Sequence, residues 1–218
     1  MPSSVKARAY DATSRRALAK ARREAILATA RDLMLRDGYA ATTIGSIAAA
    51  ASVSAETIYK AFGGKPGIVR GLYERALEGE GPDPAEQRSN RLRGTASGYE
   101  LVAAWAELAR EVAPQVAPLA VLLRDAAGST PRARSLLDEV EHARLLRMRD
   151  NARALIATGD VRPGLTKRDV TDTLFAVSAP EMFELLVSRR GWSSHRFALF
   201  QRDTLAGALL NPLGTPRI

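Results

Sequence analysis

Apolar residues recur at helical spacing through most of the chain, and the stretch 85–218 contains no convincing strand pattern. A first helix is expected from about Ser14 or Lys20 to Asp37, because one face carries a run of apolar side chains: Ile26, Leu27, Ala30, Leu33 and Met34. Gly38 follows as a left-handed stop. The pattern as a whole predicts an all-α fold.

Residues 42–65 predict two short helices joined by a tight turn. Thr43 can cap the first helix, whose apolar positions share one face: Ile44, Ile47, Ala48 and Ala51. Ser54 can cap the second, from Ala55 to Phe62, where Ile58 and Phe62 lie four residues apart on the inner side. Two short helices with a three-residue turn form a helix-turn-helix, the unit that reads DNA.

The next helix is expected to begin at Lys65-Pro66 and to reach Leu77, and the Gly- and Pro-rich stretch 79–84 is expected to be a linker. Three regions follow from this pattern. Residues 1–20 form a basic flexible arm, residues 21–79 form the helix-turn-helix domain with its connecting helix, and residues 85–218 form an all-helical domain.

The helical domain is expected to hold helices over 99–112, 114–127, 131–158, 167–189 and 194–210. Thr166 and Asp169 have the spacing of a capping box, and Ser193 can cap the last helix. Pro180 interrupts the helix over 167–189. It either kinks a helix beside a ligand cavity or separates two helices.

The segment from Arg22 to Leu77 resembles the N-terminal domain of tetracycline-repressor-type (TetR) transcriptional regulators. The matching motifs are Gly38-Tyr39, Thr42-Thr43, Ile47-Ala48, Val53-Ser54, Thr57-Ile58-Tyr59, Phe62 and Lys65, in that order. The family usually has Gly where this chain has Ser52, so the turn must hold a non-Gly residue in a conformation that Gly tolerates better. The resemblance implies a DNA-binding head joined to a C-terminal bundle for ligand binding and dimerisation.

The charge is concentrated near the N-terminus. The net charge is +8, of which residues 1–75 carry +7, from 13 Lys and Arg against 6 Asp and Glu. Charge alone fits a solvated surface as well as a DNA-binding face, and the helix-turn-helix favours DNA. The chain has no Cys, no secretory signal pattern and no apolar run long enough for a membrane span, so we expect a cytoplasmic protein with no membrane association.

The residues of the head divide by chemistry. Side chains early in the second short helix are placed to read base edges, and hydroxyls and cations are placed to bind phosphates. Lys65, at a helix start, suits a phosphate, and Lys60 a guanine or a phosphate. The predicted DNA-binding residues are Thr42, Thr43, Ser54, Ala55, Glu56, Thr57, Tyr59, Lys60 and Lys65. For each of them, an ordinary solvated surface position is the alternative.

A homodimer is expected, because two heads read two half-sites about 34–36 Å apart. In TetR-type proteins the last two long helices of each subunit make the dimer, and these would be residues 167–189 and 194–210. The predicted interface residues are Leu174, Val177, Leu186, Phe197, Phe200, Leu205 and Leu209. The alternative is that these apolar stripes form the core of a single chain.

No enzyme site, metal site or cofactor site can be assembled from the sequence, and the two histidines, His142 and His195, fit solvated or capping roles. The expected function is a ligand-responsive repressor that binds a palindromic operator and is released by a small apolar effector. The alternative is a DNA-binding regulator or architectural protein without an effector. Aromatic, Met and Leu side chains that either line a ligand pocket or form the core are Trp105, Leu122, Met148, Phe175, Met182 and Phe183.

Overall fold

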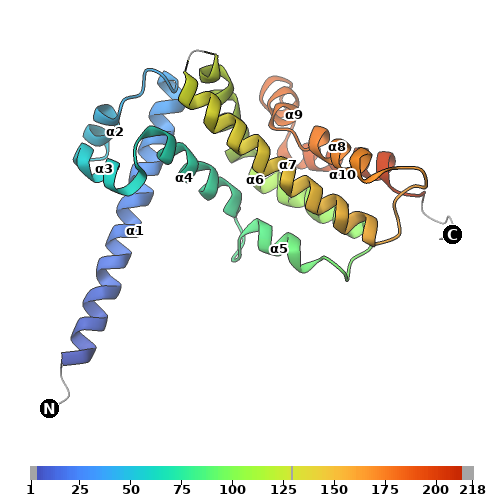
Figure 1. Cartoon of the computed structure of the whole chain (residues 1–218), viewed down its shortest axis with the longest axis horizontal. Helices are drawn as coiled ribbons and strands as arrows, with labels where there is room; N and C mark the ends of the chain where they lie inside the picture. Colours follow the sequence, from blue (N-terminus) through green and yellow to red (C-terminus); the bar gives the residue numbers. More distant parts are fainter. Residues whose placement is uncertain (1–3, 129, 213–218) are drawn as a thin grey trace. The chain divides into compact units, whose positions relative to one another are not determined.

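The computed structural model describes residues 4–128 and 130–212 (Figure 1). Its elements in chain order are α1 (Ser4–Asp37), α2 (Ile44–Ala50), α3 (Ala55–Phe62), α4 (Lys65–Glu78), α5 (Ala85–Arg91), α6 (Gly98–Ala127), α7 (Pro131–Ala157), α8 (Lys167–Val177), α9 (Pro180–Phe183), the π-helix η1 (Glu184–Arg189) and α10 (Ser194–Leu209). The predicted all-α class is confirmed. Within the described ranges, no helix combines the length and the apolar character needed to cross a bilayer.

The chain divides into two compact units, Met1–Leu72 and Tyr73–Ile218, and the division falls inside α4. The first unit is built on α1, with α2 and α3 beside it (Figure 1). Its buried core draws on every helix of the unit: Ile26, Leu27, Ala30, Met34, Tyr39, Ile47, Ala48, Ile58, Ile68, Val69 and Leu72. The apolar stripes predicted for these helices therefore face one another.

Helix α1 begins earlier than predicted. Residues 4–20, expected to be a flexible arm, continue the helix without interruption, so α1 starts at Ser4 rather than at Ser14 or Lys20. The segment is rich in Ala, Arg and Lys, which are good helix formers, and it contains neither Gly nor Pro. The basic charge of residues 4–20 suggested a flexible arm, but their high helix propensity extends α1 to Ser4.

The turn of the helix-turn-helix holds Ser52 at φ 53°, and among the described residues Ser52 alone has a positive φ without being Gly. The prediction that a Gly-type conformation falls on this residue is confirmed. Both predicted N-caps form: Thr43 Oγ1, at the start of α2, accepts from the Ser46 amide at 3.0 Å, and Ser54 Oγ, at the start of α3, accepts from the Thr57 amide at 3.1 Å. Across the turn itself, the Val53 amide donates to the Ala48 carbonyl at 3.0 Å, so local hydrogen bonds hold the turn to both helices.

The stretch 79–84, expected to be a simple linker, folds around an ion pair. Arg88 of α5 donates to both carboxylate oxygens of Glu111 of α6, at 3.0 and 2.5 Å, and also to the Asp83 carbonyl at 3.1 Å. The Glu80 amide donates to the same Glu111 carboxylate at 3.1 Å. The short polar helix α5, which lacks the apolar periodicity used for prediction, is held against α6 in this way.

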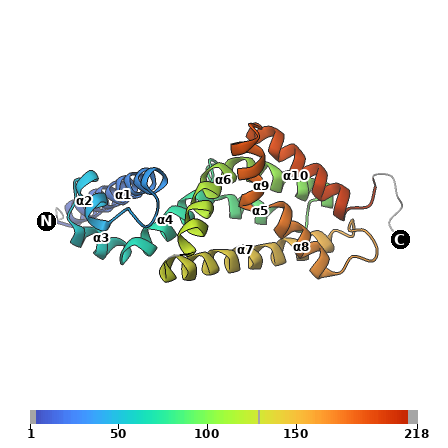
Figure 2. The same cartoon turned by 90° about the horizontal axis from the view of Figure 1, so that it is seen from above.

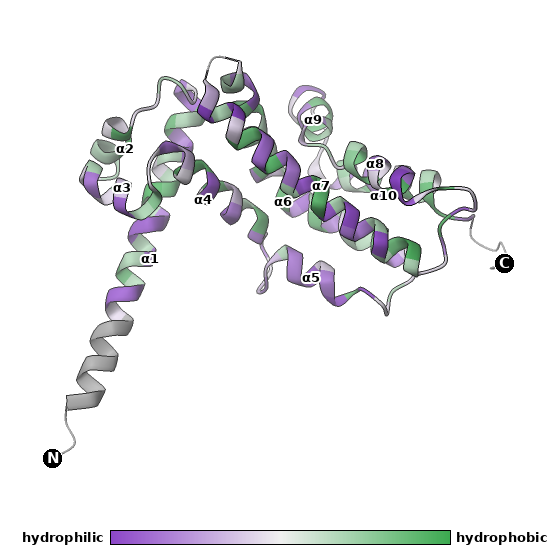
Figure 3. Cartoon of the chain, in the orientation of Figure 1, coloured by the Kyte–Doolittle hydropathy of each residue, from purple (hydrophilic) through white to green (hydrophobic). Residues whose placement is uncertain are grey.

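In the second unit, α6 packs against α7 and α10, and α8 packs against α7 and α10 (Figure 2). The main core cluster consists of Leu101, Val102, Trp105, Ala152, Leu155, Val170, Leu174, Leu205, Leu209 and Leu210. Helix α6 was predicted as two helices, over 99–112 and 114–127, but it runs unbroken through Pro114 and Pro118. The packing of its apolar face, much of which is coloured green in Figure 3, outweighs the lost backbone hydrogen bonds.

The predicted interruption at Pro180 is confirmed as a break between helices. Helix α8 ends at Val177, and α9 begins with Pro180 in its first turn. A second cluster joins this region to α6 and α10, where the rings of Phe183 and Phe197 meet edge to face at 5.2 Å beside Ala117. The predicted capping box of α8, between Thr166 and Asp169, also forms.

Candidate nucleic-acid interface

Helix α3 has one buried and one exposed face. Ile58 is fully buried, whereas Ala55, Glu56 and Lys60 are exposed and Tyr59 is 57% exposed. The polar groups of Glu56, Tyr59 and Lys60 have no hydrogen-bond or ion-pair partner among the described residues. The exposed face therefore presents one carboxylate, one phenol and one ammonium that the protein itself leaves available.

The hydroxyls predicted to bind phosphates have internal roles to different degrees. Thr42 is 2% exposed, and its hydroxyl donates to the Gly38 carbonyl at 2.9 Å. The Thr42 hydroxyl is therefore used inside the head, whereas the sequence had suggested a phosphate contact for it. Thr43 and Ser54 cap α2 and α3 while remaining exposed, and Thr57 is half-buried against the Ser54 hydroxyl at 2.9 Å.

Lys65 lies at the start of α4, as predicted, but its ammonium is turned into the protein. Nζ donates to the carbonyl oxygens of Tyr39 at 2.6 Å, Thr42 at 2.9 Å and Ala40 at 3.4 Å, and it lies 4.3 Å from the centre of the Tyr39 ring. Burial lowers the pKa of Lys65 below its usual value. The ammonium that was expected to contact a DNA phosphate is thus used for hydrogen bonds within the head.

A second cation, Arg23 of α1, contacts the C-terminal end of α3. Its Nη1 donates to the Ala61 carbonyl at 3.2 Å, and its guanidinium carbon lies 4.4 Å from the centre of the Phe62 ring. A cation at a helix C-terminus also interacts favourably with the helix dipole. Sequence reasoning missed this role, because nothing local to Arg23 indicates which carbonyl it meets.

The predicted dimer residues separate into two groups. Four lie in the core of the same chain, each at most 4% exposed: Leu174, Phe197, Leu205 and Leu209. Their own chain already covers these four side chains, in line with the alternative that they form intrachain core. Val177, Leu186 and Phe200 are half-buried, and Leu185, which precedes Leu186 in the chain, is 48% exposed. These side chains keep apolar surface that a partner could cover.

The six residues suggested for a ligand pocket are spread through the second unit. Trp105 lies in the main core and donates from Nε1 to Ser89 Oγ at 3.0 Å, and Met148 packs against the same cluster. Met182 and Phe183 belong to the second cluster, Leu122 is buried in α6, and Phe175 lies under a guanidinium. The structure does not bring them together around one space.

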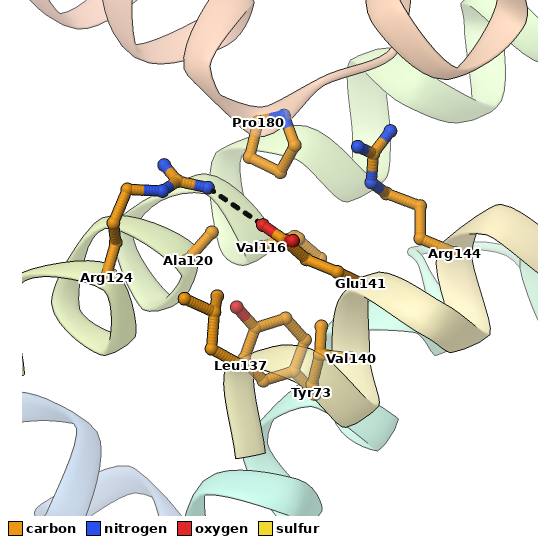
Figure 4. A pocket seen from close by; sticks show the side chains of 9 residues that line it. All are labelled: Tyr73, Val116, Ala120, Arg124, Leu137, Val140, Glu141, Arg144 and Pro180. Atoms are coloured by element: carbon orange, nitrogen blue, oxygen red, sulfur yellow. Dashed lines mark hydrogen bonds and ion pairs between the residues drawn. The ribbon is translucent and has the colours of Figure 1, made fainter. Parts of the chain in front are cut away.

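A different set of side chains lines a small cavity of about 30 Å³ in the second unit (Figure 4). The lining residues come from α4, α6, α7 and α9: Tyr73, Val116, Ala120, Arg124, Leu137, Val140, Glu141, Arg144 and Pro180. Figure 4 shows the Tyr73 hydroxyl and the Glu141 carboxylate directed into the same space, with Pro180 across from Tyr73. Pro180 thus both separates α8 from α9 and borders the cavity.

The cavity has a mixed charge pattern. Arg124 pairs with Glu141 at 3.4 Å and also with Glu181 of α9. Arg144 donates to the Phe175 carbonyl at 2.7 Å and stacks 3.4 Å from the centre of the Phe175 ring, and burial lowers its pKa.

Tyr73 stands out among the lining residues. It is 5% exposed, and its hydroxyl has no hydrogen-bond partner among the described residues. Burial raises the pKa of the phenol far above its usual value, against the opposing effect of nearby Arg124. A buried hydroxyl without a partner is costly, and it is available to a molecule that enters the cavity.

The fold is all-helical, and its N-terminal unit carries a helix-turn-helix whose second helix, α3, has an exposed polar face. Residues 26–72 match the family model described as bacterial regulatory proteins, tetR family. The resemblance drawn from the sequence is confirmed: the chain has the N-terminal domain and the fold of TetR-family transcriptional regulators. A comparison with curated proteins found no match.

Solved structures with the same fold cover most of the chain. NalD, the secondary repressor of the MexAB-OprM multidrug efflux pump in Pseudomonas aeruginosa, is 21% identical over 89% of this chain and 99% of its own, with a TM-score of 0.68. SmeT in complex with triclosan is 20% identical over 90% and 95%, with a TM-score of 0.71. The fatty acid degradation regulator FadR from Bacillus halodurans is 17% identical over 89% and 97%, with a TM-score of 0.68.

Proposed function

We propose that this protein is a ligand-responsive repressor of transcription that binds a palindromic operator as a homodimer in the cytoplasm and is released by a small molecule. The observation that carries the DNA-binding part is the outer face of α3, where Glu56, Tyr59 and Lys60 are exposed and have no partner within residues 4–128 and 130–212. Helix α3 buries Ile58 and uses the Ser54 hydroxyl for its own N-cap, whereas the polar groups of Glu56, Tyr59 and Lys60 have no internal use among the described residues and are available to DNA.

Reading and positioning fall to different residues in this proposal. Ala55, Glu56 and Thr57, in the first turn of α3, read base edges, as the N-terminal residues of a recognition helix do. Lys60 and Tyr59, further along the exposed face, bind phosphates together with the hydroxyls of the exposed caps Thr43 and Ser54. Glu56 has no attraction for phosphate, so it contributes by accepting a hydrogen bond from a base, most simply cytosine N4.

Selection of bound sites from random DNA tests this function directly, and the expected result is a palindrome. Glu56→Ala should relax the preference at one position per half-site by roughly 1–3 kcal/mol and leave the salt dependence unchanged. Lys60→Ala should weaken binding to all sequences alike and reduce the salt slope by about 1. Equal, sequence-independent losses from both variants would show that α3 does not read bases, and a failure to select any site would remove the proposal.

The homodimer is proposed to form through residues 167–210, with its apolar contact made by side chains that their own chain leaves partly uncovered. These are Leu185 and Leu186 of η1, Val177 at the end of α8 and Phe200 of α10. A dimer supplies the two heads that a palindromic operator requires.

The effector is proposed to enter the cavity beside Tyr73. The apolar lining from Val116, Leu137 and Val140 fits a small, mainly apolar molecule, and the Tyr73 hydroxyl offers it one hydrogen bond. Two regulators with this fold were solved with small molecules, SmeT with triclosan and a regulator from Saccharomonospora viridis with choline. A screen for small molecules that release operator DNA tests this part, and Tyr73→Phe should weaken the response to the effector without weakening operator binding in its absence.

A regulator without an effector remains the second candidate, because the cavity is small. A volume of about 30 Å³ compares with the roughly 300–1,000 Å³ of ligand sites, so an effector must widen the space, for which the Arg124 pairs with Glu141 and Glu181 would have to rearrange. If no compound in a broad screen releases the operator or raises the melting temperature, the second candidate holds.

A further inference from the structure

The α1–α2 loop, Gly38–Thr43, leaves backbone carbonyls that no helix ladder satisfies. Of its carbonyl oxygens, that of Gly38 accepts from the Thr42 amide and that of Thr43 accepts from the Ile47 amide. The oxygens of Tyr39, Ala40 and Thr42 lie between these two and converge on a single donor group, Lys65 Nζ. The contacts to Tyr39 and Thr42 are partly buried and the contact to Ala40 is exposed, so the ammonium satisfies carbonyls of the loop that have restricted access to water.

The ammonium has no donor to spare in this arrangement. A lysine ammonium has three N–H groups, and three carbonyl oxygens lie within 2.6 to 3.4 Å of Nζ. The Tyr39 ring lies against it at 4.3 Å, in the geometry of a cation–π contact. A phosphate oxygen could bind only after one of these contacts had broken.

We infer that Lys65 is a positioning residue that fastens the start of α4 to the α1–α2 loop and so holds α2 and the recognition helix in place, without itself binding a DNA phosphate. The loop ends in Thr43, whose side chain and backbone form the capping box with Ser46 that begins α2. Helix α2 in turn packs on α3. The hydrogen bonds from Lys65 to the loop, called the clamp below, exist in the protein without DNA. Only the expected effect on operator affinity rests on the proposed DNA-binding function.

Two variants separate a clamp from a phosphate contact. Lys65→Met removes the charge and keeps most of the stem, and Lys65→Arg keeps the charge but replaces a compact three-donor group with a planar fork. Lys60→Met is the matched control, because Lys60 is exposed and has no partner among the described residues. Titration of the full-length protein against the selected operator at several salt concentrations gives affinity and salt slope for each variant.

Both Lys65 variants should lose operator affinity by at least about tenfold while keeping the wild-type salt slope, since no phosphate contact is lost. Lys60→Met should reduce the slope by about 0.9. If Lys65→Arg binds like the wild type and Lys65→Met reduces the slope, Lys65 binds a phosphate and the inference fails.

Amide hydrogen exchange without DNA tests the clamp independently of the proposed function. The amides of Ser46 and Ile47 should exchange faster in both Lys65 variants, whereas those of Ala30 and Met34 in the middle of the head core should keep their protection. Unchanged exchange at Ser46 and Ile47, or a uniform loss of protection throughout the chain, would contradict a local clamp. If the wild type binds no operator, the proposed function fails while this measurement still decides the role of Lys65.

Discussion

Arg23 lies with its guanidinium carbon 4.4 Å from the centre of the Phe62 ring, and this contact joins the middle of α1 to the last residue of α3. The same guanidinium donates to the Ala61 carbonyl. Two cations of the basic head, Arg23 and Lys65, therefore serve the fold of the helix-turn-helix. The number of cations available to a DNA phosphate is therefore smaller than the net charge of this region indicates.

Arg23→Ala should destabilise the head by about 1 kcal/mol, from the lost cation–π contact and the lost donor at the end of α3. Its neighbour Arg22 is exposed, so Arg22→Ala serves as the control and should stay within about 0.5 kcal/mol of the wild type. Urea unfolding followed by circular dichroism measures both. Equal effects of the two variants would mean that the contact to Phe62 contributes nothing.

Ser52→Gly should stabilise the protein by roughly 0.5–1 kcal/mol, because φ 53° is strained for Ser and free of strain for Gly, and the gain is reduced by the added freedom of the unfolded chain. Ser52→Ala keeps the strain and is the control, with stability close to that of the wild type. Thermal unfolding of the three proteins decides the matter, and a loss of stability in Ser52→Gly would contradict the expected strain.

The Arg88–Glu111 pair should make stability depend on acid. The hydrogen bonds from Arg88 hold the pKa of Glu111 below its usual value, so the folded state binds the proton more weakly than the unfolded state. The stabilisation is complete above the ordinary Glu pKa of about 4.3 and is lost as the pH falls through the lowered folded value. Glu111→Gln should lower the melting temperature at neutral pH and reduce this part of the acid dependence. The melting temperatures of the wild type and the variant should be measured between about pH 3 and 7, which brackets the Glu pKa. If the two proteins show the same dependence on pH, Glu111 does not contribute to it.

Leu185→Lys should weaken the dimer, because it places a charge on an apolar side chain that is 48% exposed in the proposed interface. Leu146 of α7 is similarly exposed, at 45%, but lies outside residues 167–210, so Leu146→Lys is the matched control. In sedimentation velocity at several protein concentrations, Leu185→Lys should be monomeric, whereas Leu146→Lys and the wild type should be dimeric. Dimers in both variants would require an interface elsewhere.

Features that depend on neighbouring residues could be predicted from the sequence. The caps by Thr43, Ser54, Thr166 and Ser193 each involve a donor three residues away, and all form as expected. The demand for a left-handed residue at Ser52 is equally local. These contacts follow from residue type and spacing alone.

Features that depend on distant packing could not be predicted. The acceptors of Lys65 lie 23 to 26 residues away in the chain, and nothing near Lys65 distinguishes them from DNA phosphates as targets. Helix α6 passes through Pro114 and Pro118, which local rules treat as breaks. The cavity is lined by Tyr73 of α4 and by Glu141 of α7, which lie 68 positions apart in the chain. Only the tertiary fold brings such residues to one place.

The glycines of the stretch 79–84 surround the Arg88–Glu111 pair so closely that the segment has little freedom to vary. A Cβ added at Gly79, where φ is +74°, would lie 2.8 Å from Arg88 Nη2, and one added at Gly81 would lie 2.8 Å from the Arg88 guanidinium carbon. Composition presents these residues as an interchangeable spacer. In a library of all single substitutions, a side chain at Gly79 or Gly81 should instead displace the Arg88 guanidinium and weaken its pair with Glu111, with the larger loss of stability at Gly79 because of its positive φ.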